Sequence, residues 1–208
     1  HFLATLESDG HAFPVTQAMA SSCLLAGLKD NCSAVCLGHA LYGLSPFSVE
    51  SHDTHKDLKP VLTGLKSTLI HIGHLQAGSD IAIGGLYGLE RPRTVGVLPL
   101  GLAQGISSPQ PDKELVTLVA GRRCRVLSVS LEHCTIDLDG AGHVVVGDPV
   151  TLIGYDGEEQ MTLAEVAGAS GIGPLEMLMQ FSGRIPIRYP GKSEGAPKPQ
   201  EKFCANKH

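Results

Sequence analysis

From residue 58 to about residue 191, short apolar or alternating runs recur along the chain, and glycine, aspartate or proline separates most of them. The runs cover residues 65–72, 81–83, 94–100, 115–119, 125–131, 134–138 and 149–153. In residues 125–131 the apolar side chains occupy every second position, as a strand with one buried face requires. Strands at this spacing are typical of a small barrel or sandwich, so this region is expected to be mainly β.

Two short helices and a final strand are expected after these runs. Thr162 and Glu165 fit a capping box, in which a hydroxyl and a carboxylate bond amides at a helix start, and Gly168 suits the end of that helix. Pro174 suits the first turn of a second helix over residues 174–181. Residues 184–189 are expected to return to strand.

The rest of the chain differs from this β-rich region. In residues 1–57, short apolar stretches mix with polar clusters, and residues 48–57 have the composition of a linker. Residues 192–208 are rich in proline, lysine, glutamate and glycine, which predicts a disordered tail. We therefore expect three parts, with bounds 1–57, 58–191 and 192–208.

The composition is that of a globular protein and argues against several classes. Of the 208 residues 42% are hydrophobic and 18% charged, enough for a sizeable core. The net charge of −5 argues against a nucleic-acid or anionic-membrane binder, and without a run of 18 apolar residues no transmembrane helix is expected. The chain begins with His1 rather than Met, which fits a fragment or processed product, and no targeting segment is recognisable, so a cytoplasmic location is expected. None of the six cysteines forms a Cys-x-x-Cys pair, which predicts reduced thiols and no zinc site.

Four local motifs resemble known sites, and each has a simpler structural interpretation. Residues 71–74 spell the His-Ile-Gly-His signature of class I aminoacyl-tRNA synthetases, but they end a β-like run instead of starting a helix. His52 and His55 lack a third metal ligand at a suitable spacing. In residues 132–134 the histidine and the cysteine would point to opposite faces of a strand. Residues 168–173 are glycine-rich, but a turn between two helices explains them without a phosphate.

The order of several segments is more informative. Residues 40–47, Ala-Leu-Tyr-Gly-Leu-Ser-Pro-Phe, resemble the segment that closes the α/β barrel of alanine racemases. Segments similar to the C-terminal β domain of that family follow in the family's order, at residues 58–61, 75–80, 95–101, 146–154, 163–165 and 184–189. The resemblance runs from His1 to about Tyr189. It implies a mainly β C-terminal domain, a small β barrel with short helices, preceded by an α/β remnant of a (β/α)8 barrel.

The resemblance also implies a cofactor and its chemistry. Alanine racemases hold pyridoxal 5′-phosphate through a lysine, and a tyrosine from the partner's β domain works on the opposite face of the substrate. The lysine belongs to a half of the barrel that this chain does not contain. Ile83 stands at the tyrosine position, and Tyr87 lies four residues later. The arginine expected near the pyridine nitrogen falls in the segment Cys36-Leu37-Gly38.

Further replacements affect the segments around the substrate. In the family's segment Gly-Tyr-Ala-Asp-Gly, the tyrosine corresponds here to Leu102 and the aspartate to Gln104. The family's Met-Asp pair corresponds to Leu131 and Glu132, and the tyrosine of its Tyr-Glu pair corresponds to Leu175. What is retained concerns the phosphate: Ser22 matches a phosphate-binding serine, with Ser21 in place of a preceding asparagine. Gly38 and His39 match residues whose backbone amides reach the phosphate. Ser22, Gly38 and His39 are therefore the expected cofactor-binding residues, and no catalytic or metal-binding residue is assigned.

These observations favour a degenerate alanine-racemase-like protein that is non-catalytic in this chain alone. We expect it to act by association, as an oligomer such as a homodimer or with a racemase-like partner chain. The alternative is a racemase that uses pyridoxal 5′-phosphate and alanine and whose lysine-bearing half is missing from this chain. A third hypothesis is a β barrel that retains only phosphate affinity, through Ser22, Gly38 and His39.

Overall fold

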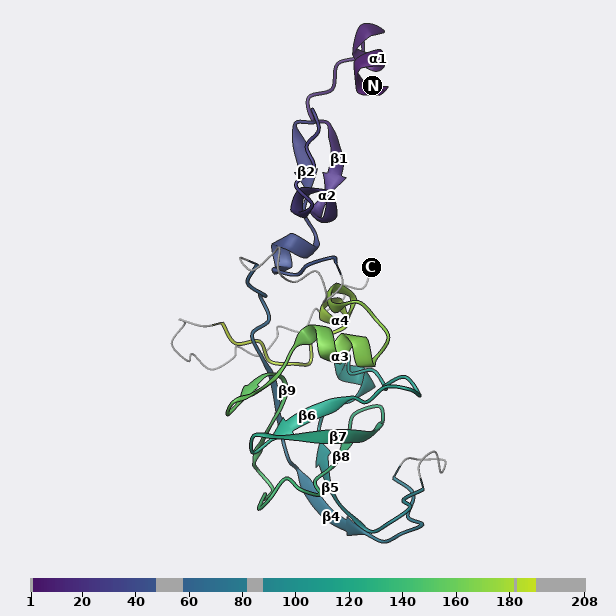
Figure 1. Ribbon diagram of the computed structural model, residues 1–208, viewed down its shortest axis with the longest axis vertical. Coiled ribbons are helices and arrows are strands. Elements are labelled where there is room, and N and C mark those ends of the chain that lie inside the picture. Colours follow the sequence, from purple (N-terminus) through teal and green to yellow (C-terminus); the bar gives the residue numbers. More distant parts are fainter. Residues whose placement is uncertain (1, 48–57, 82–87, 182, 190–208) are drawn as a thin grey trace, which may run out of the picture.

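The computed structural model describes residues 2–47, 58–81, 88–181 and 183–189. Figure 1 shows two parts of different shape: a thin arm at the N-terminal end and a curled sheet with short helices at one end. The expected linker, the tail, and the residues His52, His55, Ile83 and Tyr87 lie outside the described residues.

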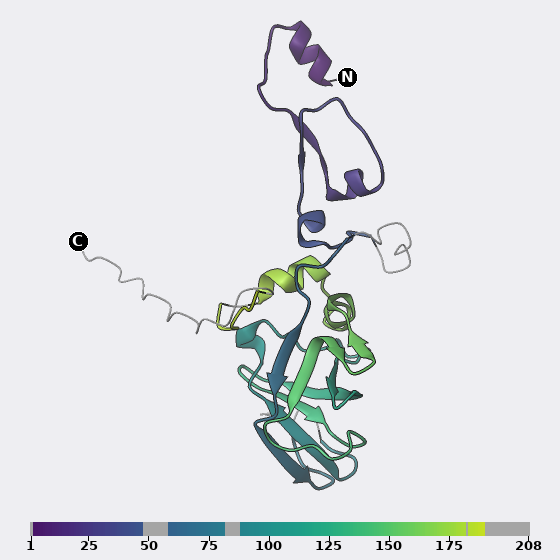
Figure 2. The ribbon, with the colours of Figure 1, turned by 90° about the vertical axis from the view of Figure 1, so that its left-hand side faces the viewer.

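Antiparallel strands form the curled sheet. Its strands are β3 (Leu65–Thr68), β4 (His71–Leu75), β5 (Arg93–Leu98), β6 (Val116–Val119), β7 (Arg122–Val129), β8 (Cys134–Asp137), β9 (Pro149–Asp156) and β10 (Glu159–Met161). Their order is β10-β9-β6-β7-β8-β5-β4, and β3 pairs with β9. The sequence-based expectation of a mainly β fold with a small, barrel-like sheet and short helices is confirmed (Figures 1 and 2).

A bend at Leu69 and Ile70 brings the two ends of the sheet together. The amide of Leu69 donates to the carbonyl of Asp148 at 2.9 Å, and the amide of Ile70 donates to the carbonyl of Val97 at 2.9 Å. One stretch of chain therefore pairs with β9 on one side of the bend and with β5 on the other. The single strand expected over residues 65–72 is wrong for this reason, because two successive amides bond to different neighbouring strands.

The core fills the inside of this curl. Leu69, Leu98, Leu118, Ile136 and Val150 are all completely buried. Gly96 of β5 is needed for this packing, since a Cβ atom there would meet the side chains of Leu69, Leu138 and Ile136. Short apolar runs thus supply one packed interior, as their spacing predicts.

The strand β7 buries the opposite face from the one that the alternation suggests. Cys124, Val126 and Ser128 are buried, whereas Leu131 lies beyond the strand and is 66% exposed. The pairing of β7 with β8 shifts register between Val126 and Ser128. The strand itself is confirmed, but the pattern of Leu127, Val129 and Leu131 does not identify its core side.

Two helices cover one end of the sheet, α3 (Leu163–Ala169) and α4 (Pro174–Gln180). The capping box is confirmed: the hydroxyl of Thr162 accepts from the amide of Glu165 at 3.1 Å, and Glu165 Oε2 accepts from the amide of Thr162 at 2.7 Å. Gly168 does not end α3 as expected. The helix continues to Ala169, and the amide of Ile172 bonds back to the carbonyl of Ala167 at 3.1 Å across Gly171, which has φ of +73°.

The last expected strand is absent. Gly183 and Arg184 form a turn, and residues 185–189 belong to no strand. Pro186 has no amide hydrogen to donate to a ladder, which explains why this apolar stretch does not pair as predicted. Conversely β10, three residues long, carries too short a pattern to be recognised from the sequence.

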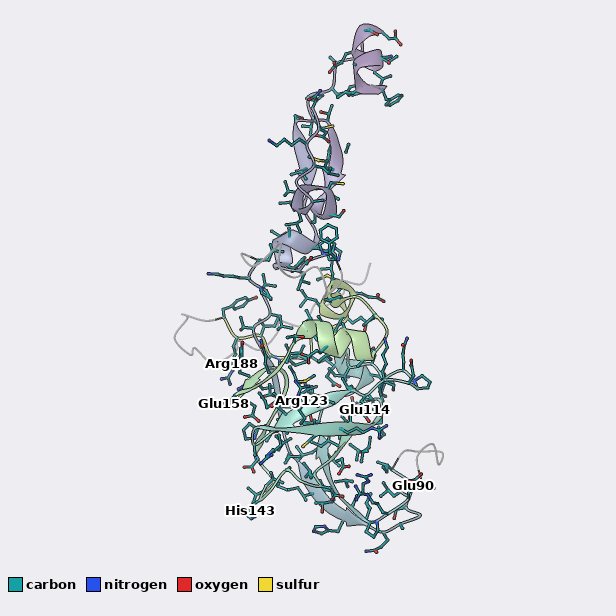
Figure 3. All side chains as sticks on the ribbon, in the orientation of Figure 1. Glu90, Glu114, Arg123, His143, Glu158 and Arg188 are labelled. Atoms are coloured by element: carbon teal, nitrogen blue, oxygen red, sulfur yellow. The ribbon has the colours of Figure 1, made fainter. Side chains whose placement is uncertain are left out.

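The arm contains α1 (Phe2–Ser8), β1 (Gln17–Ala20), α2 (Ser21–Leu25), β2 (Ala34–Cys36) and the 3-10 helix η1 (His39–Tyr42). The strands β1 and β2 are parallel neighbours, so β1, α2 and β2 make a small βαβ unit. Large apolar side chains remain exposed along the arm, among them Val15 at 67%, Leu28 at 58% and Leu41 at 66%. Figure 3 shows side chains projecting from this unit on several sides without a second layer over them.

The two buried cysteines of the sheet provide a test of the core. Burial, with a smaller effect of the Asp137 charge, raises the pKa of Cys124 from its ordinary 9.0 to about 11, and burial raises the pKa of Cys134 to about 12. Between pH 9 and 11 these thiols ionise in the unfolded chain before they ionise in the folded one. The folded state then holds the extra protons, so the free energy of unfolding is expected to fall by about 1.4 kcal/mol per pH unit for each thiol.

Urea unfolding at a series of pH values measures this slope, and Cys134→Ala is expected to reduce it by about half. An identical slope in the variant would contradict the assignment of the pH dependence to these thiols.

Candidate functional site

The two strands of the arm end at the same edge, and a short helix follows each of them within three residues. Ser21 follows β1 and begins α2, while Gly38 precedes η1 two residues after β2. Because β1 and β2 are parallel, the residues after both strands gather at one edge. Ser22, Gly38 and His39, the three residues expected at a phosphate, are all partly buried in this region.

Ser21 connects the two turns. Its side-chain Oγ accepts hydrogen bonds from the backbone amides of Gly38 at 2.9 Å and Ala40 at 3.3 Å. Ser21 is 3% exposed and is the buried residue of α2. The sequence predicted a role for Ser22 and not for Ser21. The position of Ser21 could have indicated its role, because Ser21 directly follows a strand that lies parallel to the strand before Gly38.

Two hollows among the described residues lie elsewhere. One, of about 440 Å³, is on the arm and is lined by residues of 19–35 that include Leu24, Leu28 and Lys29 but not Ser22. The other, of about 320 Å³, lies beneath α3 and is lined by Lys113, Arg123 and Glu165 among others. In Figure 3 Arg123 and Glu114 lie on the sheet next to α3, far from the arm.

Three charged groups in or beside the second hollow, Arg123, Glu159 and Glu165, pair with one another. Arg123 Nε donates to Glu159 Oε2 at 2.9 Å, and Arg123 Nη2 lies 3.5 Å from Glu165 Oε1. The hydrogen bond with Glu159 raises the pKa of Arg123 most, against the effect of burial. Burial would raise the pKa of the Glu165 carboxyl, but bonds from Thr162 and Arg123 outweigh it and the pKa is lowered. This network fastens α3 to β7 and β10.

The remaining positions taken from the resemblance carry little chemistry in their described surroundings. Leu102 and Leu131 lie close, since the amides of residues 102 and 103 donate to the carbonyls of residues 130 and 131, and both side chains are more than half exposed. Gln104 Oε1 accepts from the amide of Gly101 at 2.9 Å. The Glu132 carboxylate pairs with Arg184 at 3.3 Å.

The structure also places the local motifs. Residues 71–75 are strand β4, and His74 Nδ1 lies 3.1 Å from Thr94 Oγ1, so the tetrapeptide is not a helix start. Cys134 is buried and His133 exposed, so they face apart as expected. The amides of Ser170, Gly171 and Ile172 all bond to carbonyls of α3, so the glycine-rich segment is a turn between helices.

The described ranges, 2–47, 58–81, 88–181 and 183–189, contain neither a metal-binding cluster nor a membrane-spanning helix. No group of three or more His, Cys, Asp and Glu side chains in them is placed to hold a metal ion. Within the same ranges no helix has the length and apolar character needed to span a bilayer.

The family model described as "Alanine racemase, C-terminal domain" matches residues 62–189. The chain belongs to the alanine racemase family. The alanine racemase of Streptococcus equi subsp. zooepidemicus is 37% identical over 158 residues, covering 76% of this chain and 42% of that protein. That of Methanococcus maripaludis is 28% identical over 189 residues, covering 90% of this chain and 50% of that protein.

Solved structures of the family agree with the fold. The alanine racemase of E. faecalis superposes with a TM-score of 0.74 at 33% identity, covering 89% of this chain and 48% of that one. The alanine racemase of Bacillus anthracis gives a TM-score of 0.73 at 28% identity, covering 88% and 47%. The chain spans about half the length of the alanine racemases that it matches.

The family implies pyridoxal 5′-phosphate, and the residues at the strand-end edge can be compared with the needs of its phosphate. A phosphate needs several free donors that converge on it. The amide of Gly38, one of the three expected donors, already donates to Ser21 Oγ. The arginine expected near the pyridine nitrogen falls in the segment Cys36-Leu37-Gly38, which contains no arginine. The donor set of this chain does not fit the cofactor.

Proposed function

We propose that this chain is a degenerate member of the alanine racemase family that does not racemise alanine by itself and acts by associating with another chain. The β domain is retained, with a family match over residues 62–189. The positions at which the resemblance expects acid–base or cofactor-binding groups carry other residues, of which Ile83 for tyrosine has no proton to exchange.

The arm is the observation that carries the proposed association. Parallel sheets are normally covered on both faces and built from more than two strands, whereas β1 and β2 form a parallel pair with exposed apolar neighbours. Among the residues that the structure describes, each of these strands also has a single neighbour, which leaves a row of backbone groups for further pairing. A chain with compatible parallel strands, a second copy or a racemase-like α/β half, would cover these edges and faces.

The experiment measures mass and chemistry on the same preparation. Light scattering on the purified protein is expected to give a mass above the 21.8 kDa of one chain. The double variant Val15→Glu with Leu41→Glu, both in the arm and 67% and 66% exposed, is expected to reduce the mass to that of a monomer. Val146→Glu is the matched control, because it places a charge at a residue 58% exposed in the β domain.

The same samples are then incubated with pyridoxal 5′-phosphate and alanine. We expect no absorbance band that borohydride reduces and no racemisation. A reducible band with turnover would contradict the proposal and support the racemase alternative, with Lys59 and Lys66 as the first lysines to test. A monomer at all concentrations would contradict association between copies, and mixing with the barrel half of a racemase would then decide between a foreign partner and none.

A further inference from the structure

We infer that the side-chain oxygen of Ser21 takes the place of an anion. It accepts hydrogen bonds at the edge where the family resemblance places a phosphate, so that the two turns at this edge are held together without a ligand. Backbone amides that converge on one point at the start of a helical turn form a concave site for an anion oxygen. Here the amides of Gly38 and Ala40 converge on Ser21 Oγ, at 2.9 and 3.3 Å. The receiving oxygen belongs to the protein.

The position of Ser21 makes this arrangement durable. The residue is 3% exposed and comes directly after β1, so the pairing of β1 with β2 fixes the distance between its hydroxyl and the turn at Gly38. An arriving phosphate oxygen would have to displace a buried acceptor that already satisfies two donors. The neighbouring Ser22 hydroxyl, which makes no hydrogen bond with the described residues, would offer only one donor in exchange.

The charge of the arm also disfavours a bound phosphate. Residues 2–47 contain one lysine, Lys29, and no arginine, against Glu7, Asp9 and Asp30. Lys29 lines the arm's hollow, which Ser21, Ser22 and Gly38 do not line. A phosphate at the strand-end edge would therefore meet a net negative segment without a cation among its expected donors.

Amide NMR on the whole chain tests the inference. In the wild type, the Gly38 and Ala40 amide resonances are expected not to move when inorganic phosphate or pyridoxal 5′-phosphate replaces chloride at constant ionic strength. In Ser21→Ala both amides are expected to exchange with solvent roughly tenfold faster, the effect of losing one hydrogen bond each. Ser21→Thr, which keeps a hydroxyl, is expected to restore the protection, and Ser22→Ala is the matched control that leaves it unchanged.

A saturable shift of the Gly38 or Ala40 resonance with phosphate in the wild type would overturn the inference, as would unchanged exchange in Ser21→Ala. If Ser21→Ala does not fold, the wild-type titration and Ser21→Thr still decide. Failure of this inference can be told apart from failure of the proposed association. The phosphate titration reports on two amides within one chain, whereas light scattering measures the mass of the assembly.

Discussion

Gly43→Ala is expected to destabilise the protein by about 2–5 kcal/mol, because it combines two costs. Gly43 ends η1 with φ of +66°, a left-handed conformation that costs other residues about 1–2 kcal/mol. Its added Cβ would also overlap the backbone carbonyl of Lys59 and lie 2.8 Å from the nitrogen of Pro60, and overpacking of this kind costs about 1–3 kcal/mol. Neither obstacle can rotate away, since both are main-chain atoms.

This glycine lies where the arm meets the β domain. The amide of Val61 donates to the carbonyl of Tyr42 at 3.1 Å, and Leu44 is 7% exposed within the core. Denaturant unfolding followed by circular dichroism measures the loss. Gly140→Ala is the matched control, with φ of +88° and no atom within 4 Å of the new Cβ, so it isolates the backbone cost. Equal losses in the two variants would show that the contact with Lys59 contributes nothing.

Gly105→Ala is expected to lower the melting temperature by about 6–12 °C, from a loss of about 3 kcal/mol in a chain of this size. Gly105 follows the 3-10 helix η3 (Leu102–Gln104) with φ of +90°, and its Cβ would collide with the main chain of Gln180 and Phe181 at the end of α4. The turn would have to move away from α4, whose Met177 is completely buried.

Differential scanning calorimetry gives the melting temperature, and amide exchange in α4 shows whether the loss is centred there. Gly78→Ala serves as the control, since its φ of +82° is similar and no atom lies within 4 Å of the added carbon. Faster exchange in α4 is expected for Gly105→Ala alone. If both variants melt at one temperature, the contact with α4 is not what constrains Gly105.

Local patterns in the sequence predicted the elements that depend on local chemistry. The capping box of Thr162 and Glu165 and the helix begun by Pro174 follow from side chains within one turn, and the structure contains both. The strands were predicted by alternation and turn residues. Alternation did not reveal which face of β7 is buried, because that depends on which neighbours pair with it across the register shift at Val126 and Ser128.

Long-range geometry accounts for most of what the sequence did not predict. The bend at Leu69 arises because Asp148 and Val97, far along the chain, receive two successive amides. At the candidate site, Ser21 and Gly38 are 17 residues apart and meet only because β1 and β2 pair in parallel. The resemblance placed Ser22 and Gly38 in one region and implied a phosphate oxygen as the acceptor for the Gly38 amide, but it did not indicate that Ser21 Oγ accepts from this amide.

The pairing of β3 with β9 has a consequence for how the chain is made. Leu65 lies opposite Ile153, so β3 leaves the ribosome long before its partner strand has been synthesised. During that interval its hydrogen-bonding groups and apolar side chains are open to other chains, and contacts between such distant residues are slow to form. We therefore expect the seam between β3 and β9 to close last, making it the step at which misfolding in the cell competes with completion of the sheet.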